Sequence, residues 1–161
     1  MKKIEQLVHC GEGGRAIRKN LKVSVCSFIV GVFLSISAVA AFAGTAYGEW
    51  GYYGPINNYS YQNRASITTG GSYAYAYTEV QNQAFENIPT GYMGAKARMY
   101  DSSNNLVSQS DYYYNSEPLY SMSQSTSRWW GGTYYSKGLT QAWNGSNYVT
   151  YNTFPSPSQN H

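Results

Sequence analysis

Small or apolar residues alternate with polar or aromatic ones along much of the chain after residue 44, and a period of two is typical of β-strands. In residues 92–100 one face carries only small or sulfur-containing side chains, which are Met93, Ala95, Ala97 and Met99. The opposite face carries polar or aromatic side chains, which are Tyr92, Lys96, Arg98 and Tyr100. In residues 72–80, Tyr73, Tyr75 and Tyr77 alternate with Ala74, Ala76 and Thr78. The pattern predicts antiparallel strands with one buried face.

About seven short strands are predicted, and turn-forming residues separate them. We expect them at Tyr59–Thr68, Ser72–Val80, Tyr92–Tyr100, Leu106–Tyr114, Leu119–Arg128, Thr133–Trp143 and Tyr148–Phe154. Gly70-Gly71 and Asn144-Gly145 are typical of tight turns, and residues 101–105 are typical of a polar hairpin loop. The fold class is therefore expected to be all-β, an antiparallel β-sandwich. We expect a single domain at 44–154 and a disordered tail at 155–161.

The first 43 residues have the pattern of an export signal. A basic segment ends at Lys22, and residues 23–40 form an apolar run without charge. Ala41 and Ala43 then provide the small-x-small pattern that signal peptidase recognises. We expect a cleavable helical signal peptide at 1–43, a secreted protein, and no stable membrane span after cleavage. The alternative is an uncleaved anchor, because the run is just long enough to cross a bilayer.

The composition of residues 44–161 excludes several classes of chemistry. This part has five basic and six acidic residues, a net charge of −1, no cysteine and only the terminal His161. A thiol nucleophile, a disulfide and a cysteine metal site are thereby excluded, and a histidine triad nearly so. The net charge also argues against nucleic-acid binding. We expect no catalytic residue, no metal, no cofactor and no enzymatic activity.

Two alternatives use the carboxylates. Paired carboxylates would suit a secreted hydrolase, and the candidates are Glu79, Glu86, Asp101, Asp111 and Glu117. The stretch 101–105 could provide oxygen ligands for calcium, but with one acidic residue it is more typical of a turn.

Aromatic residues dominate what remains. All 18 tyrosines and all four tryptophans lie after residue 44, whereas only nine residues there are Ile, Leu or Val. Several aromatics are consecutive, such as Trp129-Trp130, and consecutive side chains of a strand point to opposite faces. Half or more of the rings are therefore expected outside the core, where they mark a ligand-contact surface. Its candidate residues are Trp50, Tyr52, Tyr73, Tyr75, Tyr77, Tyr92, Lys96, Arg98, Tyr100, Trp129, Trp130 and Trp143. The alternative is that tyrosine simply replaces Val and Ile on outer strand faces.

Short motifs in residues 48–115 resemble a known family. They are the Gly- and Trp-rich start at 48–54, the small residues Ala74, Ala76 and Thr78, the stretch 91–97, and Tyr112-Tyr113-Tyr114-Asn115. This order resembles the lactococcin 972 family of bacteriocins. The resemblance implies an exported, cysteine-free, small β-sandwich that acts on the envelope of neighbouring bacteria by binding lipid II. The chain departs from the family because it continues for about 45 residues beyond the motifs and lacks the family's basic charge.

The function expected from the sequence is thus that of a secreted, non-enzymatic, bacteriocin-like protein. Its partner would be a component of the cell envelope, such as lipid II or a glycan. The alternative is a secreted glycan- or wall-binding structural module without killing activity, and assembly into films is a lesser one. The sequence does not fix an oligomeric state.

Overall fold

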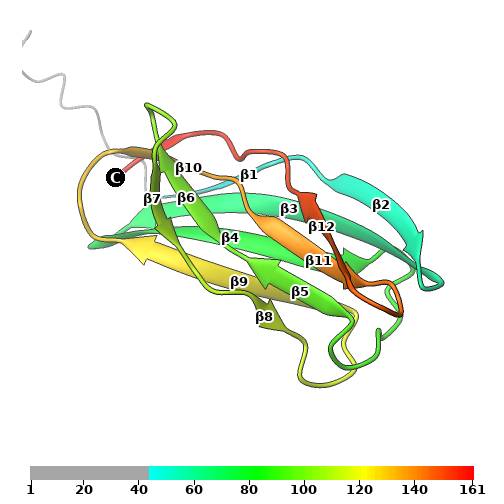
Figure 1. Ribbon diagram of the computed structural model, residues 1–161. Helices are drawn as coiled ribbons and strands as arrows, with labels where there is room; N and C mark the ends of the chain where they lie inside the picture. Colours follow the sequence, from blue (N-terminus) through cyan, green and yellow to red (C-terminus); the bar gives the residue numbers. More distant parts are fainter. Residues whose placement is uncertain (1–43) are drawn as a thin grey trace, which may run out of the picture. The chain divides into compact units, whose positions relative to one another are not determined.

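A computed structural model describes residues 44–161, which are all-β with thirteen strands in three antiparallel sheets (Figure 1). The strands are β1 (Gly44–Tyr47), β2 (Gly51–Ile56), β3 (Tyr59–Gly70), β4 (Tyr73–Asn82), β5 (Met93–Lys96), β6 (Arg98–Asp101), β7 (Leu106–Gln109), β8 (Tyr113–Tyr114), β9 (Ser121–Arg128), β10 (Thr133–Ser136), β11 (Leu139–Trp143), β12 (Tyr148–Asn152) and β13 (Gln159–Asn160). Within this range no helix is long and apolar enough to span a membrane.

The largest sheet has five strands and is built on the long β3–β4 hairpin. Its order is β1-β3-β4-β9, and β2 pairs with another stretch of the β3 edge that β1 occupies. The hairpin register places Gly70 opposite Tyr73, so the turn residues are Gly71 and Ser72. This register also places Arg64 opposite Glu79.

Two four-stranded sheets, β13-β10-β6-β7 and β12-β11-β5-β8, lie end to end. Two strands of one sheet run almost directly into two strands of the other. Only Ala97 separates β5 from β6, and only Lys137 and Gly138 separate β10 from β11. Backbone hydrogen bonds bridge the gap, since Ser110 N donates to Ala97 O at 3.0 Å and Lys137 N donates to Arg98 O at 3.2 Å. The two sheets therefore form a second layer, which lies across the five-stranded sheet in Figure 1.

Small side chains fill much of the space between the layers. On β4 the residues Ala74, Ala76, Thr78 and Val80 are fully buried, and on the second layer Met93, Ala95, Ala97 and Met99 are fully buried. Two apolar clusters result, one around Ile88 and Met93 and the other around Ile67 and Met99. The alternation predicted for residues 92–100 is confirmed for these four side chains.

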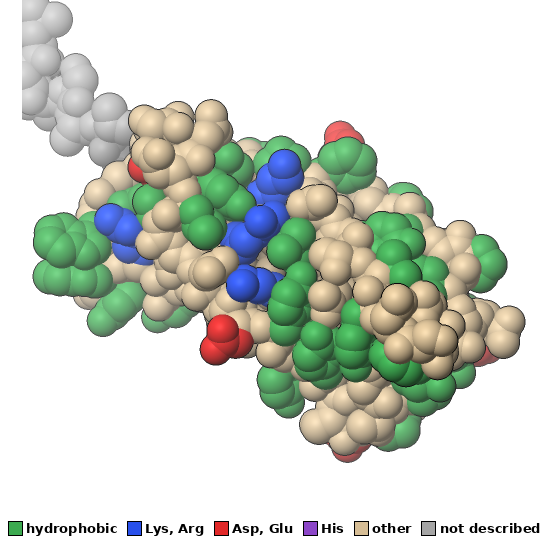
Figure 2. All heavy atoms as spheres, viewed as in Figure 1, with side chains coloured by type: hydrophobic (Ala, Val, Ile, Leu, Met, Phe, Trp, Pro, Cys, Tyr) green, Lys and Arg blue, Asp and Glu red, His purple; other side chains and the backbone are tan. Residues whose placement is uncertain are grey.

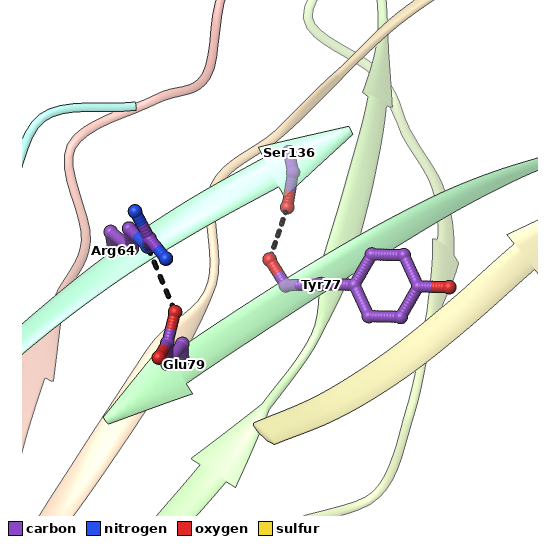
Figure 3. Close-up of polar contacts among 4 residues, drawn as sticks. All are labelled: Arg64, Tyr77, Glu79 and Ser136. Atoms are coloured by element: carbon purple, nitrogen blue, oxygen red, sulfur yellow. Dashed lines mark hydrogen bonds and ion pairs between the residues drawn. The ribbon is translucent and has the colours of Figure 1, made fainter. Parts of the chain in front are cut away.

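Buried polar side chains add hydrogen bonds between elements around the apolar clusters. The side chain of Asn115 accepts a bond from Met93 N at 3.0 Å and donates to Pro89 O and Glu117 O at 2.9 and 2.8 Å. Ser136 on β10 donates across the layers to the backbone oxygen of Tyr77 at 3.1 Å (Figure 3). Gly138 approaches β4 so closely that an added Cβ would overlap the side chain of Thr78. The contacts of Ser136 and Gly138 fix how the second layer sits on β4.

The structure differs from the sequence-based expectations in three respects. All seven predicted strands contain strand structure, but those at 92–100, 106–114 and 133–143 are each divided in two, and β1, β2 and β13 were not predicted. The expected number of seven was therefore too low. The segment 155–161, expected to be a disordered tail, contains β13, which pairs with β10, and the buried side chain of Ser156. The signal peptide, with Ala41 and Ala43, lies outside the described residues.

We expect the protein to lose stability above pH 10. Burial raises the pKa of the Tyr53 and Tyr61 hydroxyls well above the ordinary value of 10.0. The folded protein thus keeps two protons that the unfolded chain loses, so the free energy of unfolding is unaffected below pH 10 and falls above it. The fall is about 1.4 kcal/mol per pH unit for each hydroxyl. Urea unfolding between about pH 8 and about pH 11.5 measures it.

Tyr61→Phe is the matched control for that measurement. The Tyr61 hydroxyl is buried and has no hydrogen-bond partner among residues 44–161. Its removal should therefore leave stability at pH 8 unchanged or slightly raised, and should lower the alkaline slope by about 1.4 kcal/mol per pH unit, the share of one hydroxyl. A slope that Tyr61→Phe does not change would contradict the assignment.

Candidate ligand-binding surfaces

The twelve candidate residues lie in separate places and do not form one surface. Those on the outer face of the five-stranded sheet are Trp50, Tyr52, Tyr73, Tyr75 and Tyr77. Those on the outer face of the second layer are Lys96, Arg98, Tyr100 and Trp143. Trp129 and Trp130 lie in the loop between β9 and β10, and Tyr92 packs against the core. The candidates are therefore divided among two outer faces, one loop and the edge of the core.

Alternation along β4 places a row of three rings on the outer face of the five-stranded sheet. The ring centroids of Tyr73 and Tyr75 are 6.0 Å apart, and those of Tyr75 and Tyr77 are 6.3 Å apart. Tyr73 and Tyr75 are 44% and 37% exposed. Beside this row, β9 carries hydroxyls at every second position, which are Ser121, Ser123, Ser125 and Ser127. We call this outer face, with its rings and hydroxyls, the tyrosine face.

Arg64 is held in a fixed position on the tyrosine face. Its Nε donates to Glu79 Oε2 at 2.8 Å, a contact between paired positions of β3 and β4 (Figure 3). Its guanidinium carbon lies 4.5 Å from the ring centroid of Tyr47 and 4.4 Å from that of Trp50. Three side chains thus orient the guanidinium, while its two terminal amino groups have no hydrogen-bond partner among the described residues.

An open groove of about 570 Å³ runs over this part of the tyrosine face. Its lining combines one ion pair with aromatic and hydroxyl side chains: Thr45, Tyr47, Arg64, Ser66, Thr68, Tyr77, Glu79, Tyr120, Ser121, Met122 and Ser123. Because Arg64 and Glu79 neutralise each other, the groove offers donors, acceptors and ring faces without a net charge. Such a lining suits a ligand rich in hydroxyl or amide groups.

The outer face of the second layer has the opposite electrostatic character. Lys96 and Arg98 point outward from β5 and β6, and alternation places Lys137 on the same side. Figure 2 shows Lys and Arg side chains gathered in the middle of this face, with hydrophobic side chains on both sides and acidic side chains toward the edges. We call the surface of Lys96, Arg98, Lys137 and the adjoining rings the basic face.

Rings adjoin the cations on both sides. Arg98 Cζ lies 5.6 Å from the ring centroid of Tyr100, which stacks on Tyr135 at 5.3 Å. On the other side, Lys96 Nζ lies 5.6 Å from the ring centroid of Tyr112. Tyr114 lies flat over Gly94 and donates to Gln141 Oε1 at 2.5 Å. A second aromatic group, Tyr112, Tyr114, Trp143 and Tyr148, thus extends from Lys96 along the layer.

The loop tryptophans lie at an end of the five-stranded sheet. Trp129 and Trp130 are 63% and 58% exposed, with ring centroids 4.8 Å apart. Trp129 lines a hollow of about 490 Å³ together with the β3–β4 turn and the C-terminal His161. The exposure of this pair agrees with the expectation that consecutive aromatics cannot all be core. Among the 24 aromatics of the described range only Tyr61 and Tyr134 are buried.

Two of the five carboxylates that could have supplied acid/base chemistry are bound to neighbouring groups. Glu79 is paired with Arg64. The Asp101 carboxylate accepts bonds from Asn105 and Ser103 in its own hairpin loop, and these bonds lower its pKa. Within residues 44–161 no group of three or more His, Cys, Asp or Glu side chains is arranged to hold a metal ion.

Sequence reasoning missed several residues of both faces. Arg64 and Tyr47 were not candidates, and Glu79 was considered only as a possible catalytic carboxylate, although the three meet in one groove. Lys137 and Tyr135 were likewise missed on the basic face. The alternation of Tyr135 and Lys137 with Tyr134 and Ser136 was a signal that could have placed them outward.

We expect the Arg64–Glu79 ion pair to contribute little to stability. Both side chains are about one quarter exposed, at 28% and 27%, and such pairs are typically worth about 0.2–1 kcal/mol. A double-mutant cycle of Arg64→Met and Glu79→Gln, followed by urea unfolding, should return a coupling energy in that range. A coupling above about 2 kcal/mol would instead show that the pair holds the fold together.

Comparison of the chain with protein-family models, with curated proteins and with solved structures finds no match.

Proposed function

We propose that this protein is a secreted, non-enzymatic β-sandwich that binds glycan in the cell envelope, with the tyrosine face as its binding surface. The observation that carries the proposal is the fixed Arg64 guanidinium in an open groove beside a row of exposed tyrosines. A sugar ring has an apolar face that can lie on an aromatic ring and hydroxyls that need donors and acceptors. The groove offers both within one surface.

The fixed position of Arg64 favours this function over a simple solvated surface. An exposed arginine normally loses side-chain entropy when it binds a ligand, and that loss weakens binding. Here the ion pair and the two ring contacts have already restricted the side chain. The free amino groups of Arg64 and the second oxygen of Glu79 can then bond to neighbouring hydroxyl or amide groups of one ligand.

A second candidate function is bacteriocin-like action on lipid II, which the family resemblance suggests. The basic face favours it, because Lys96, Arg98 and Lys137 beside tyrosine rings suit the pyrophosphate and the sugars of that molecule. Protein beginning at Gly44 should then inhibit growth of Gram-positive indicator strains and be retained by lipid II on vesicles. No inhibition of any strain and no retention would remove this candidate.

For glycan binding, we expect retention on purified peptidoglycan or on a neutral insoluble polysaccharide such as chitin or cellulose. Arg64→Met and Tyr77→Ala should each weaken binding by about tenfold, equivalent to about 1.4 kcal/mol. Because the groove carries no net charge, about 0.5 M salt should have little effect. Binding isotherms measured by depletion from solution give all three results.

Tyr113→Ala is the matched control, since Tyr113 is 50% exposed but lies on β8 of the second layer and does not line the groove. It should bind as tightly as the unaltered protein. The proposal fails if no polymer of the panel retains the protein, or if Arg64→Met and Tyr77→Ala bind no more weakly than Tyr113→Ala.

A further inference from the structure

The basic face holds cations that the fold itself does not neutralise. Three of the five basic residues in the described range lie there, although the net charge of this range is −1. The one ion pair within residues 44–161 is Arg64–Glu79, which belongs to the tyrosine face. Asp101, the acidic neighbour of Tyr100, directs its carboxylate into its own loop. Lys96, Arg98 and Lys137 thus form a local positive field on a slightly acidic domain.

Two hydrogen bonds hold Arg98 in place among these cations. Arg98 Nε donates to Lys137 O at 3.1 Å, and Arg98 Nη2 donates to Asn152 Oδ1 at 3.2 Å. These bonds hold the guanidinium over the junction of the two sheets, and its other amino group has no hydrogen-bond partner in the described range. Lys96 and Arg98 are two residues apart on one face, which is about 6.6 Å along a strand. The face therefore presents several separate positive charges rather than one focused pocket.

Aromatic rings lie beside the charges, and their presence limits which kinds of ligand fit this face. Tyr100 and Tyr135 stack at an interplanar angle of 16° next to Arg98, and Tyr112 adjoins Lys96. A ligand that satisfied only the charges would gain nothing from these rings. A chain of sugar rings with a negative group on each repeat can contact both.

We propose that the basic face binds an acidic polysaccharide. The carboxylate or phosphate groups of such a polymer would pair with Lys96, Arg98 and Lys137, and its sugar rings would lie on Tyr100, Tyr112 and Tyr135. This face belongs to the layer opposite the tyrosine face. If the proposed glycan binding at the tyrosine face holds, both polymers can be bound at once, but binding at the basic face does not depend on it.

The test measures binding to polygalacturonate, which carries one carboxylate per sugar. Its methyl-esterified form is the uncharged control, because it keeps the sugar chain and removes the charge. The unaltered protein should bind polygalacturonate at least about tenfold more tightly than the ester, with affinity that falls as salt rises. The double variant Lys96→Gln/Lys137→Gln should weaken this binding by about tenfold and make the salt dependence shallower. It leaves Arg98 and its bonds in place, so the fold should be retained, as urea unfolding can verify.

Arg64→Met separates this inference from the proposed function. It should bind polygalacturonate as tightly as the unaltered protein, whatever it does to binding of neutral glycan. Equal affinity for polygalacturonate and its ester would overturn the inference, as would a Lys96→Gln/Lys137→Gln variant that binds unchanged. Duplex DNA bound more tightly than polygalacturonate through the same lysines would also overturn it, because the face would then recognise phosphate backbones without regard to sugar stacking.

Discussion

The fold depends on a division of side chains by size between the two sides of each strand. On β4 and on β5–β6, nearly every inward position is Ala, Thr, Val or Met, and nearly every outward position is Tyr, Lys, Arg or Glu. The small inward residues bring the layers so close that Gly138 meets the side chain of Thr78. Where the layers are this close there is little room for rings, and the rings on β4 and β6 point outward and contribute to the two faces. Rings do lie between the layers near β2, where Tyr53 stacks on Tyr61 and Tyr151.

A core with so few aliphatic side chains must bury polar groups, and most of these groups are bonded. Asn115 bonds to the backbone of three segments, and Thr140 Oγ1 contacts Asn63 Nδ2 at 2.7 Å and the Tyr53 hydroxyl at 3.0 Å. An unbonded buried polar group typically costs about 1–3 kcal/mol. These bonds also select one arrangement of the layers, because apolar contacts between small side chains alone are not directional.

The sequence predicted the all-β class and the alternation of residues 92–100, because both follow from local periodicity. The groove could not be predicted, because it depends on hairpin register. A turn at Gly70-Gly71, as expected, would pair Arg64 with Tyr77, whereas the actual turn at Gly71-Ser72 pairs Arg64 with Glu79. The contacts of Tyr47 and Trp50 with Arg64 are also non-local. The breaks at Ala97 and at Lys137-Gly138 leave the alternation intact, so periodicity could not reveal them.

Both faces carry tyrosine rings, but they differ in how their charges are arranged. The tyrosine face pairs its cation with an anion, whereas the cations of the basic face have no such partner. On the tyrosine face the cation and the anion occupy paired positions of neighbouring strands, so Glu79 would repel an acidic ligand that approached Arg64. On the basic face the outward positions paired with Lys96 and Arg98 are Leu139 and Gln109, which carry no charge. An acidic ligand therefore meets no carboxylate at those paired positions. Strand register, rather than overall composition, thus determines where this weakly charged domain presents positive charge without a paired carboxylate.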